Sequence, residues 1–114
     1  MPWDLDTWLE FYSPANAPIY NFRGVPGNPP NKMLQLAFQN PAWKKEFEDN
    51  LMNLRDGPYS ALPAQVTAVC DQIRPHFIDD PNKTETVAEM DQDCQDIKDG
   101  IAKRIAFLKS ALGR

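Results

Sequence analysis

Proline is the residue that most limits how this chain can fold. Six of its eleven prolines lie within the first 31 residues. Each proline fixes φ and removes a backbone hydrogen-bond donor, so neither a long helix nor a central strand fits this stretch. The sequence therefore predicts an irregular segment over residues 1–31.

The same segment is rich in aromatic side chains, namely Trp3, Trp8, Phe11, Tyr12, Tyr20 and Phe22. These are too many for a solvated tail, because apolar surface of this size is normally buried. We expect the segment to lie as a strap across the helices that follow it. A ligand-stacking role for the aromatic rings is the alternative.

Residues 32–56 show the periodicity of helices. Asn31 is expected to cap a short helix carrying Met33, Leu34, Ala37 and Phe38. Asn40 is expected to cap a second helix, with Pro41 in its first turn, where the missing N–H costs little. The buried face predicted for this second helix consists of Trp43, Phe47, Leu51 and Leu54. The run Asp56-Gly57-Pro58 is expected to end it.

Two further helices are predicted. Ser60 is the expected cap of the third, with Pro63 in its first turn and an apolar stripe of Val66, Val69, Cys70, Ile73 and Phe77. Residues 79–82 are expected to turn the chain into the longest helix. Its stripe is Val87, Met90, Cys94, Ile97, Ile101, Ile105, Leu108 and Leu112. The predicted fold is mainly α: a small bundle of three to four helices over residues 32–114, behind an irregular proline- and aromatic-rich segment at 1–31.

Charge and hydropathy exclude several classes of partner. The net charge of −4 and the isoelectric point near 4.8 argue against nucleic acid, which requires a clustered basic face. No apolar run reaches the length of a membrane span. Acidic residues also interrupt the first ten positions, so the charged-then-apolar layout of a signal peptide is missing.

Asp4 and Asp6 are the candidate metal ligands. On an extended chain, residues two apart point to the same face. Two adjacent carboxylates are a natural seat for Mg²⁺, which takes only one or two ligands from protein. The alternative is a pair of solvated acids.

The motif around these acids resembles the CotH-type spore-coat kinases, a family of atypical bacterial protein kinases. The residues that carry the resemblance are Pro2-Trp3-Asp4-Leu5-Asp6-Thr7-Trp8, Asn40-Pro41-Ala42-Trp43-Lys44-Lys45-Glu46-Phe47 and the closing run at residues 101–108. The resemblance implies that Asp4 holds a Mg²⁺ ion bridging the nucleotide phosphates, with Asp6 as its helper. It implies a parent enzyme that moves the γ-phosphoryl group of ATP to protein serine or threonine. The expected location is the bacterial cytoplasm, the spore coat or the cell surface.

The resemblance covers only the C-terminal part of a kinase-like domain. The family's nucleotide-binding lysine and catalytic-loop aspartate would both precede Met1. The five glycines are scattered, with no phosphate-binding spacing. We therefore expect this chain alone to be inactive and to bind neither Mg²⁺ nor ATP tightly. Its expected partners are the missing N-terminal kinase lobe and the parent's protein substrate, and an apolar patch where that lobe docked is expected to drive self-association.

Three other features have simpler interpretations. The acidic run at residues 91–96 lacks the glycine and glutamate of an EF-hand loop, so we interpret it as a solvated helix face. Cys70 and Cys94 fit best as small buried hydrophobes, although a disulfide is possible if the third and fourth helices pack together. The single histidine, His76, fits a structural or surface role. The basic pairs Lys44-Lys45 and Lys103-Arg104 fit solvated helix faces.

Two other functions remain open. The chain is alternatively a self-standing helical interaction module that binds a protein through its aromatic strap, with no catalytic activity. A small hydrolase assembled from His76 with Ser60, Cys70 or Ser110 is a third, weaker hypothesis, since no local signature supports it.

Overall fold

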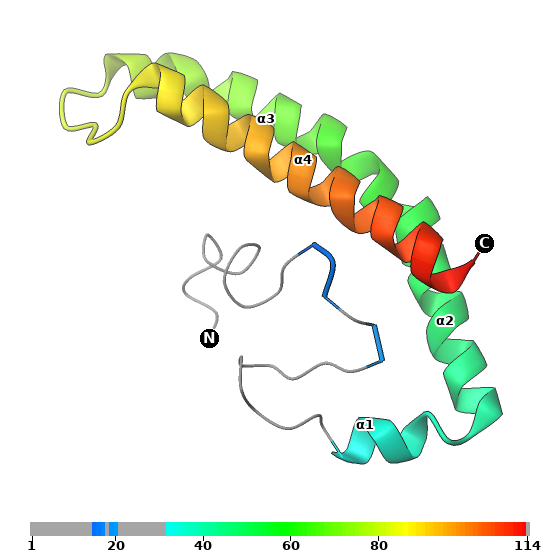
Figure 1. The fold of residues 1–114 in the computed structure, drawn as a ribbon. Helices are drawn as coiled ribbons and strands as arrows, with labels where there is room; N and C mark the ends of the chain where they lie inside the picture. The colour runs from blue at the N-terminus through cyan, green and yellow to red at the C-terminus, as the bar shows by residue number, and fades with distance from the viewer. Residues whose placement is uncertain (1–14, 18, 21–31, 114) are drawn as a thin grey trace.

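The computed structural model describes residues 15–17, 19–20 and 32–113 (Figure 1). Within these ranges the chain is helical, with one short and three long helices and no strand. They are α1 (Lys32–Ala37), α2 (Pro41–Asp56), α3 (Pro58–Asp79) and α4 (Val87–Leu112). The mainly α fold predicted from the sequence is confirmed. None of the helices in this part is long and apolar enough to cross a membrane.

The helices form an open arrangement built on one hairpin. Helices α3 and α4 run antiparallel side by side, and α2 joins the end of this hairpin at the same end as the C-terminus (Figure 1). The Cα radius of gyration is 17.4 Å, whereas a compact domain of this length has a radius of about 13 Å. Only three described apolar residues are buried: Ile19, Met90 and Leu108.

The second helix begins as the sequence predicts. The Asn40 side chain accepts a hydrogen bond from the Ala42 backbone N–H at 3.0 Å, and Pro41 occupies the first turn. This cap satisfies one of the backbone donors that every helix leaves free at its start. The helix ends at Asp56, also as expected.

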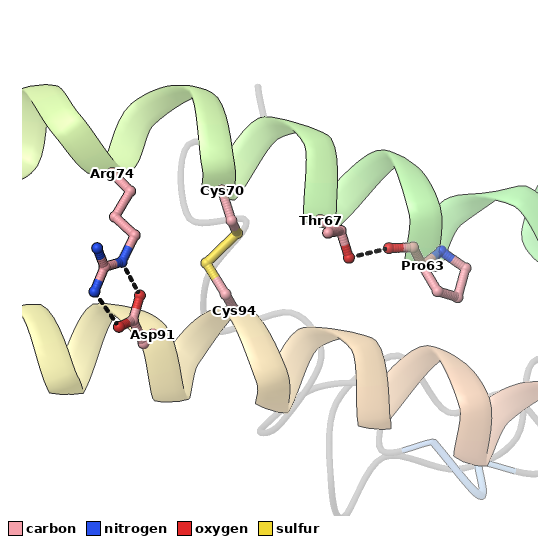
Figure 2. The surroundings of a disulfide bond; sticks show 6 residues. All are labelled: Pro63, Thr67, Cys70, Arg74, Asp91 and Cys94. Atoms are coloured by element: carbon pink, nitrogen blue, oxygen red, sulfur yellow. Dashed lines mark hydrogen bonds and ion pairs between the residues drawn. A yellow bond between two sulfur atoms is a disulfide. The ribbon is translucent and has the colours of Figure 1, made fainter.

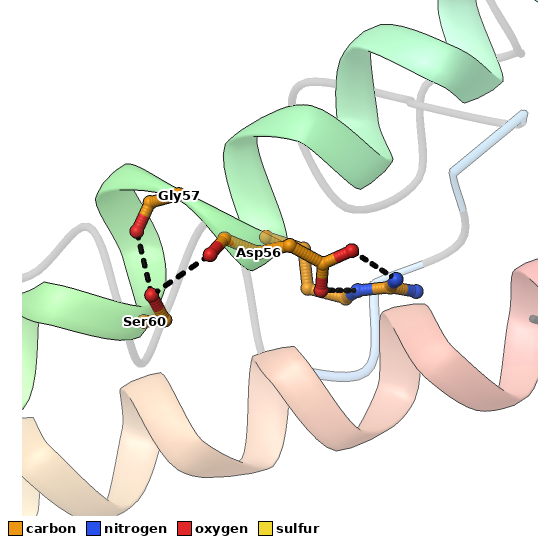
Figure 3. Close-up of polar contacts among 4 residues, drawn as sticks. Asp56, Gly57 and Ser60 are labelled. Carbon is orange, nitrogen blue, oxygen red and sulfur yellow. Dashed lines mark hydrogen bonds and ion pairs between the residues drawn. The ribbon is translucent and has the colours of Figure 1, made fainter.

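The predicted start of the third helix is wrong. α3 begins at Pro58 with Gly57 as its N-cap, so Pro63 lies inside the helix. The Ser60 hydroxyl donates to the backbone carbonyls of Asp56 (3.0 Å) and Gly57 (2.7 Å), and so it caps no backbone N–H (Figure 3). Proline is well suited to a first helical position, and this preference of Pro58 overrides the capping tendency of Ser60.

A single glycine joins α2 to α3. Gly57 is both the C-cap of α2 and the N-cap of α3. A Cβ atom at this position would lie 2.9 Å from the backbone oxygen of Asn53, which is closer than real Cβ contacts. The tight joint between the two helices therefore depends on glycine.

The apolar stripes are only partly buried. Phe47 and Leu51 of α2 are half-buried, but Trp43 and Leu54 are 59% and 42% exposed, so the predicted buried face is wrong at both its ends. On α3 and α4 the predicted residues Val69, Ile73 and Ile97 are also exposed. The spacing defines the stripe correctly, but neighbouring elements cover only part of each helix.

The start of α4 carries a capping box. The Thr86 hydroxyl accepts from the Glu89 backbone N–H, while the Glu89 carboxylate accepts from the Thr86 backbone N–H at 2.7 Å. This reciprocal pair satisfies two donors at the helix start. The hydrogen bonds from the Thr86 backbone and hydroxyl lower the pKa of Glu89 below its ordinary value.

Because of this capping box, we expect the folded protein to lose stability in acid. Because the folded-state pKa of Glu89 is lowered, its contribution is fully present above the unfolded pKa, about 4.3, and is lost as the pH falls through the folded value. Asp56 and Asp91, whose pKa values are lowered by their arginine partners, act in the same direction. We expect the melting temperature to hold between pH 7 and 5 and to fall below about pH 4.5.

The variant Glu89→Gln should make this fall shallower, as followed by circular dichroism melts at pH 7, 5, 4 and 3. The matched control Glu85→Gln changes an exposed carboxylate in the preceding loop and should keep the wild-type profile. A Glu89→Gln protein that loses as much stability as wild type between pH 5 and 3 would show that the capping box is not a source of the acid sensitivity.

Candidate functional site

The predicted metal ligands Asp4 and Asp6 lie outside the described residues. Of the aromatic residues in the predicted strap, only Tyr20 lies inside them. The structure therefore leaves the metal hypothesis and the strap hypothesis as predictions. It does describe how residues 15–17 and 19–20 are held against the helices.

No metal centre is formed elsewhere in the described ranges. Residues 15–17, 19–20 and 32–113 contain no group of three or more His, Cys, Asp or Glu side chains placed to hold a metal ion. The acidic run that invited a calcium interpretation lies within the continuous helix α4. In this run Asp91 pairs with Arg74, and Asp96 accepts from the Gln92 amide at 2.8 Å.

The ring of Tyr20 packs in an aromatic cluster with Phe38 and Phe47. It packs edge-on against Phe38, with ring centroids 5.6 Å apart, and lies 6.5 Å from the ring of Phe47. The Tyr20 hydroxyl donates to the Glu48 carboxylate, and the Lys44 ammonium lies 4.8 Å from the Tyr20 ring centroid. A cation over a ring face and an edge-to-face ring pair are both favourable geometries. This cluster therefore anchors residue 20 to the α1–α2 region.

A second anchor is provided by Arg104 of α4. Its Nη1 donates to the backbone carbonyl of Ala17 at 2.6 Å and to that of Ala15 at 3.3 Å. The guanidinium also lies 5.3 Å from the ring centroid of Phe107. Burial lowers the pKa of Arg104, while the nearby Tyr59 opposes this shift. The prediction that Arg104 lies on a solvated face is wrong, because residues 15–17 cover it.

Cys70 and Cys94 form a disulfide that joins α3 to α4 (Figure 2). Their Cα atoms are 6.4 Å apart, within the range that a disulfide spans. The preferred interpretation of both cysteines as free buried hydrophobes is therefore wrong, and the disulfide alternative is correct. Because its sulfur is bonded, Cys70 cannot serve as the nucleophile of the hydrolase hypothesis.

One helical turn along from the disulfide, an ion pair joins the same two helices. Arg74 Nε donates to Asp91 Oδ1 at 2.9 Å, and Arg74 Nη2 donates to Asp91 Oδ2 at 3.0 Å (Figure 2). This hydrogen bonding lowers the pKa of Asp91. The pair is exposed and contributes modestly to stability, although its two parallel bonds fix the register of the helices.

Comparison with models of known protein families shows which family this helical chain belongs to. A model of the family described as CotH kinase protein matches residues 1–108, which is nearly the whole chain. The chain belongs to the CotH kinase protein family. The resemblance inferred from the sequence is thus confirmed, and a kinase family implies ATP as the family's phosphoryl donor. No curated protein and no solved structure matches the chain.

The match places the two anchors within the CotH family region. It spans the Pro-Trp-Asp-Leu-Asp motif, Tyr20 and Arg104 together. The sequence analysis named Tyr20 only as one of six aromatic residues in the N-terminal segment, and nothing distinguished it from the others. Arg104 gave no usable signal, because a guanidinium that binds backbone carbonyls nearly 90 residues earlier leaves no local pattern.

Proposed function

We propose that this chain is the C-terminal part of a CotH kinase domain, whose parent enzyme transfers the γ-phosphoryl group of ATP to serine or threonine of a protein. The observation that carries this proposal is the family match over residues 1–108, which includes the motif at residues 2–6. Within it, Asp4 is the Mg²⁺ ligand and Asp6 assists. A metal ion that bridges the phosphates is a part that kinases share.

The isolated chain is inactive in this proposal. Phosphoryl transfer depends on positioning and on neutralising charge around the phosphates, through a phosphate-covering loop, a lysine and metal ions. The sequence of 114 residues contains no glycine-rich loop with phosphate-binding spacing. The chain supplies the metal-binding carboxylates and part of the helical lobe, and the parent supplies the rest.

The exposed apolar side chains of the described helices support the proposal. Met33, Leu36 and Trp43 in the α1–α2 region are 80%, 60% and 59% exposed. Large apolar groups at this exposure are typical of a surface that another protein part covers. In the proposal that part is the remainder of the kinase domain, and in its absence these residues favour self-association.

Titration with MgCl₂ tests the metal role of Asp4. Isothermal calorimetry of the 114-residue chain should give weak binding in the millimolar range, because two carboxylates without further ligands hold Mg²⁺ poorly. Asp4→Asn should remove this binding, and Asp6→Asn should weaken it. The control Asp93→Asn changes an exposed acid of α4 and should leave it unaltered. Equal binding by wild type and Asp4→Asn would refute the assignment.

One observation favours the alternative of a self-standing interaction module. The Cys70–Cys94 disulfide joins the two longest helices, and small domains with little buried apolar surface often rely on such a bond for stability of their own. The module hypothesis predicts a cooperative melt, no response to nucleotide and no effect of Asp4→Asn in the titration above.

A further inference from the structure

Helices α2 and α3 meet at a joint of one residue. Gly57 alone separates the end of α2 at Asp56 from the start of α3 at Pro58. The two backbone dihedrals of this residue set the direction of α2 relative to the α3–α4 hairpin, and glycine restricts them less than any other residue. Figure 1 shows α1 at the opposite end of α2, where the helix points away from the hairpin. The joint is therefore a natural pivot.

A small rotation at this pivot has a large effect at the far end of α2. Phe47 lies ten residues before Gly57, which is about 15 Å along a helix. A rotation of about 20° at the joint would therefore move Phe47 by about 5 Å. Contacts close to the pivot resist such a rotation with a short lever arm. A contact near the start of α2 resists it much better.

The chain makes such a contact through residues 17 and 20. Arg104 of α4 donates to the backbone carbonyl of Ala17 at 2.6 Å. Three residues further along the chain, the ring of Tyr20 packs with Phe38 and Phe47 beside the start of α2. Three residues span at most about 10–11 Å. This link between α4 and the α1–α2 region is therefore short and leaves little freedom between its two ends.

Both ends of the link are held by several interactions. The guanidinium of Arg104 is a rigid fork of N–H donors, and its charge-assisted bonds are stronger than bonds between neutral groups. It also donates to the carbonyl of Ala15, and its side chain is half-buried. At the other end the Tyr20 hydroxyl donates to the Glu48 carboxylate. Ile19, which lies between the two ends in the sequence, is only 8% exposed.

We propose that the link between residues 17 and 20 is a clasp, which fixes the angle between α2 and the α3–α4 hairpin and so holds the Gly57 joint in one conformation. The exposed apolar side chains of the α1–α2 region, Met33, Leu36 and Trp43, thereby keep one orientation relative to the hairpin for a protein partner to recognise. The two ends of the clasp act in series, so loss of either end frees the joint to the same extent. This inference does not depend on the proposed kinase function.

Electron–electron distance measurements on the 114-residue chain test the proposal. Spin labels on ketone-bearing noncanonical residues replace Glu46 of α2 and Gln72 of α3, both exposed, and leave the disulfide intact. Wild type should give one narrow distance distribution. Arg104→Met keeps the apolar stem but removes the donors, and Tyr20→Ala removes the ring. Each should widen the distribution at least twofold, and the double variant should be no wider than either single variant.

Two controls separate release of the clasp from general loosening of the fold. Lys103→Met changes an exposed neighbour of Arg104 and should keep the narrow distribution. A second pair of labels, at Gln72 and Ala102, reports on the hairpin alone and should stay narrow in every variant. A broad distribution in wild type, or a narrow one in either single variant, would overturn the clasp. So would a double variant wider than both singles, or a hairpin pair that widens together with the first pair.

Discussion

Reduction of the Cys70–Cys94 disulfide is expected to lower the melting temperature of the chain by more than 10 °C. The bond closes a loop over a sequence separation of 24 residues. Cross-linking a loop of this length restricts the unfolded chain by an amount equivalent to about 3.5 kcal/mol at 25 °C. Each kcal/mol shifts the melting temperature of a domain near this size by roughly 4–8 °C.

The open packing of the helices makes this loss hard to offset. Val69 and Ile73, which flank Cys70 on α3, are 55% and 46% exposed. Pro63 and Pro75 lie inside the same helix, and each removes a backbone hydrogen bond. Few buried apolar contacts therefore remain to hold α3 against α4 once the disulfide is opened.

Circular dichroism melts with and without dithiothreitol measure this effect. The control is the double variant Cys70→Ala/Cys94→Ala, which should melt near the reduced wild type and should not respond to the reductant. Oxidised and reduced wild type melting within 2 °C of each other would show that the helical hairpin holds together without its covalent link.

The second large effect is the complete absence of phosphoryl transfer. Incubated with [γ-³²P]ATP, Mg²⁺ and a serine- and threonine-rich acceptor protein, the 114-residue chain should incorporate no label above background. Kinase catalysis arises almost entirely from positioning and charge stabilisation around the phosphates. Removal of the elements that provide these should therefore abolish the reaction instead of slowing it slightly.

A full-length CotH kinase assayed in parallel serves as the positive control. In that enzyme, replacing the aspartate that corresponds to Asp4 with asparagine should lower the rate by about a hundredfold or more, the size of effect seen when one transition-state stabilising group is lost. Label incorporated by the 114-residue chain and absent from its Asp4→Asn variant would mean that the chain is catalytically competent, contrary to the proposal.

Local signals in the sequence predicted the helices well. The cap formed by Asn40 with Pro41, and the break at Asp56-Gly57-Pro58, are found as expected. Both depend on backbone chemistry within a few residues. The capping box of Thr86 and Glu89 has a local pattern of the same kind, Thr-x-x-Glu before an apolar run, but it was not predicted.

Features that depend on packing between helices were predicted less well. Trp43 and Leu54 have the spacing of a buried stripe but are exposed, because spacing identifies a face without showing what covers it. Cys70 and Cys94 could be assigned only as either buried thiols or a disulfide, since their separation depends on how α3 packs on α4. The contact of Arg104 with Ala15 and Ala17 is longer in range still.

For the candidate metal site, the sequence is more informative than the structure. Asp4 and Asp6 were identified from a short motif, and the family match over residues 1–108 supports the ancestry that the motif indicates. Their arrangement is a prediction because both lie outside the described residues. The first described residues after them in the sequence are 15–17, and the sequence pattern offered no means of finding the contact of Ala15 and Ala17 with Arg104.

The intact mass of the protein recovered from its natural source tests the central claim most directly. The proposal that this chain is the C-terminal part of a CotH kinase domain predicts a mass well above 13.0 kDa, with a phosphate-binding lobe ahead of the Pro-Trp-Asp-Leu-Asp motif. A natural protein of 13.0 kDa would contradict that proposal and would favour a helical module that works alone.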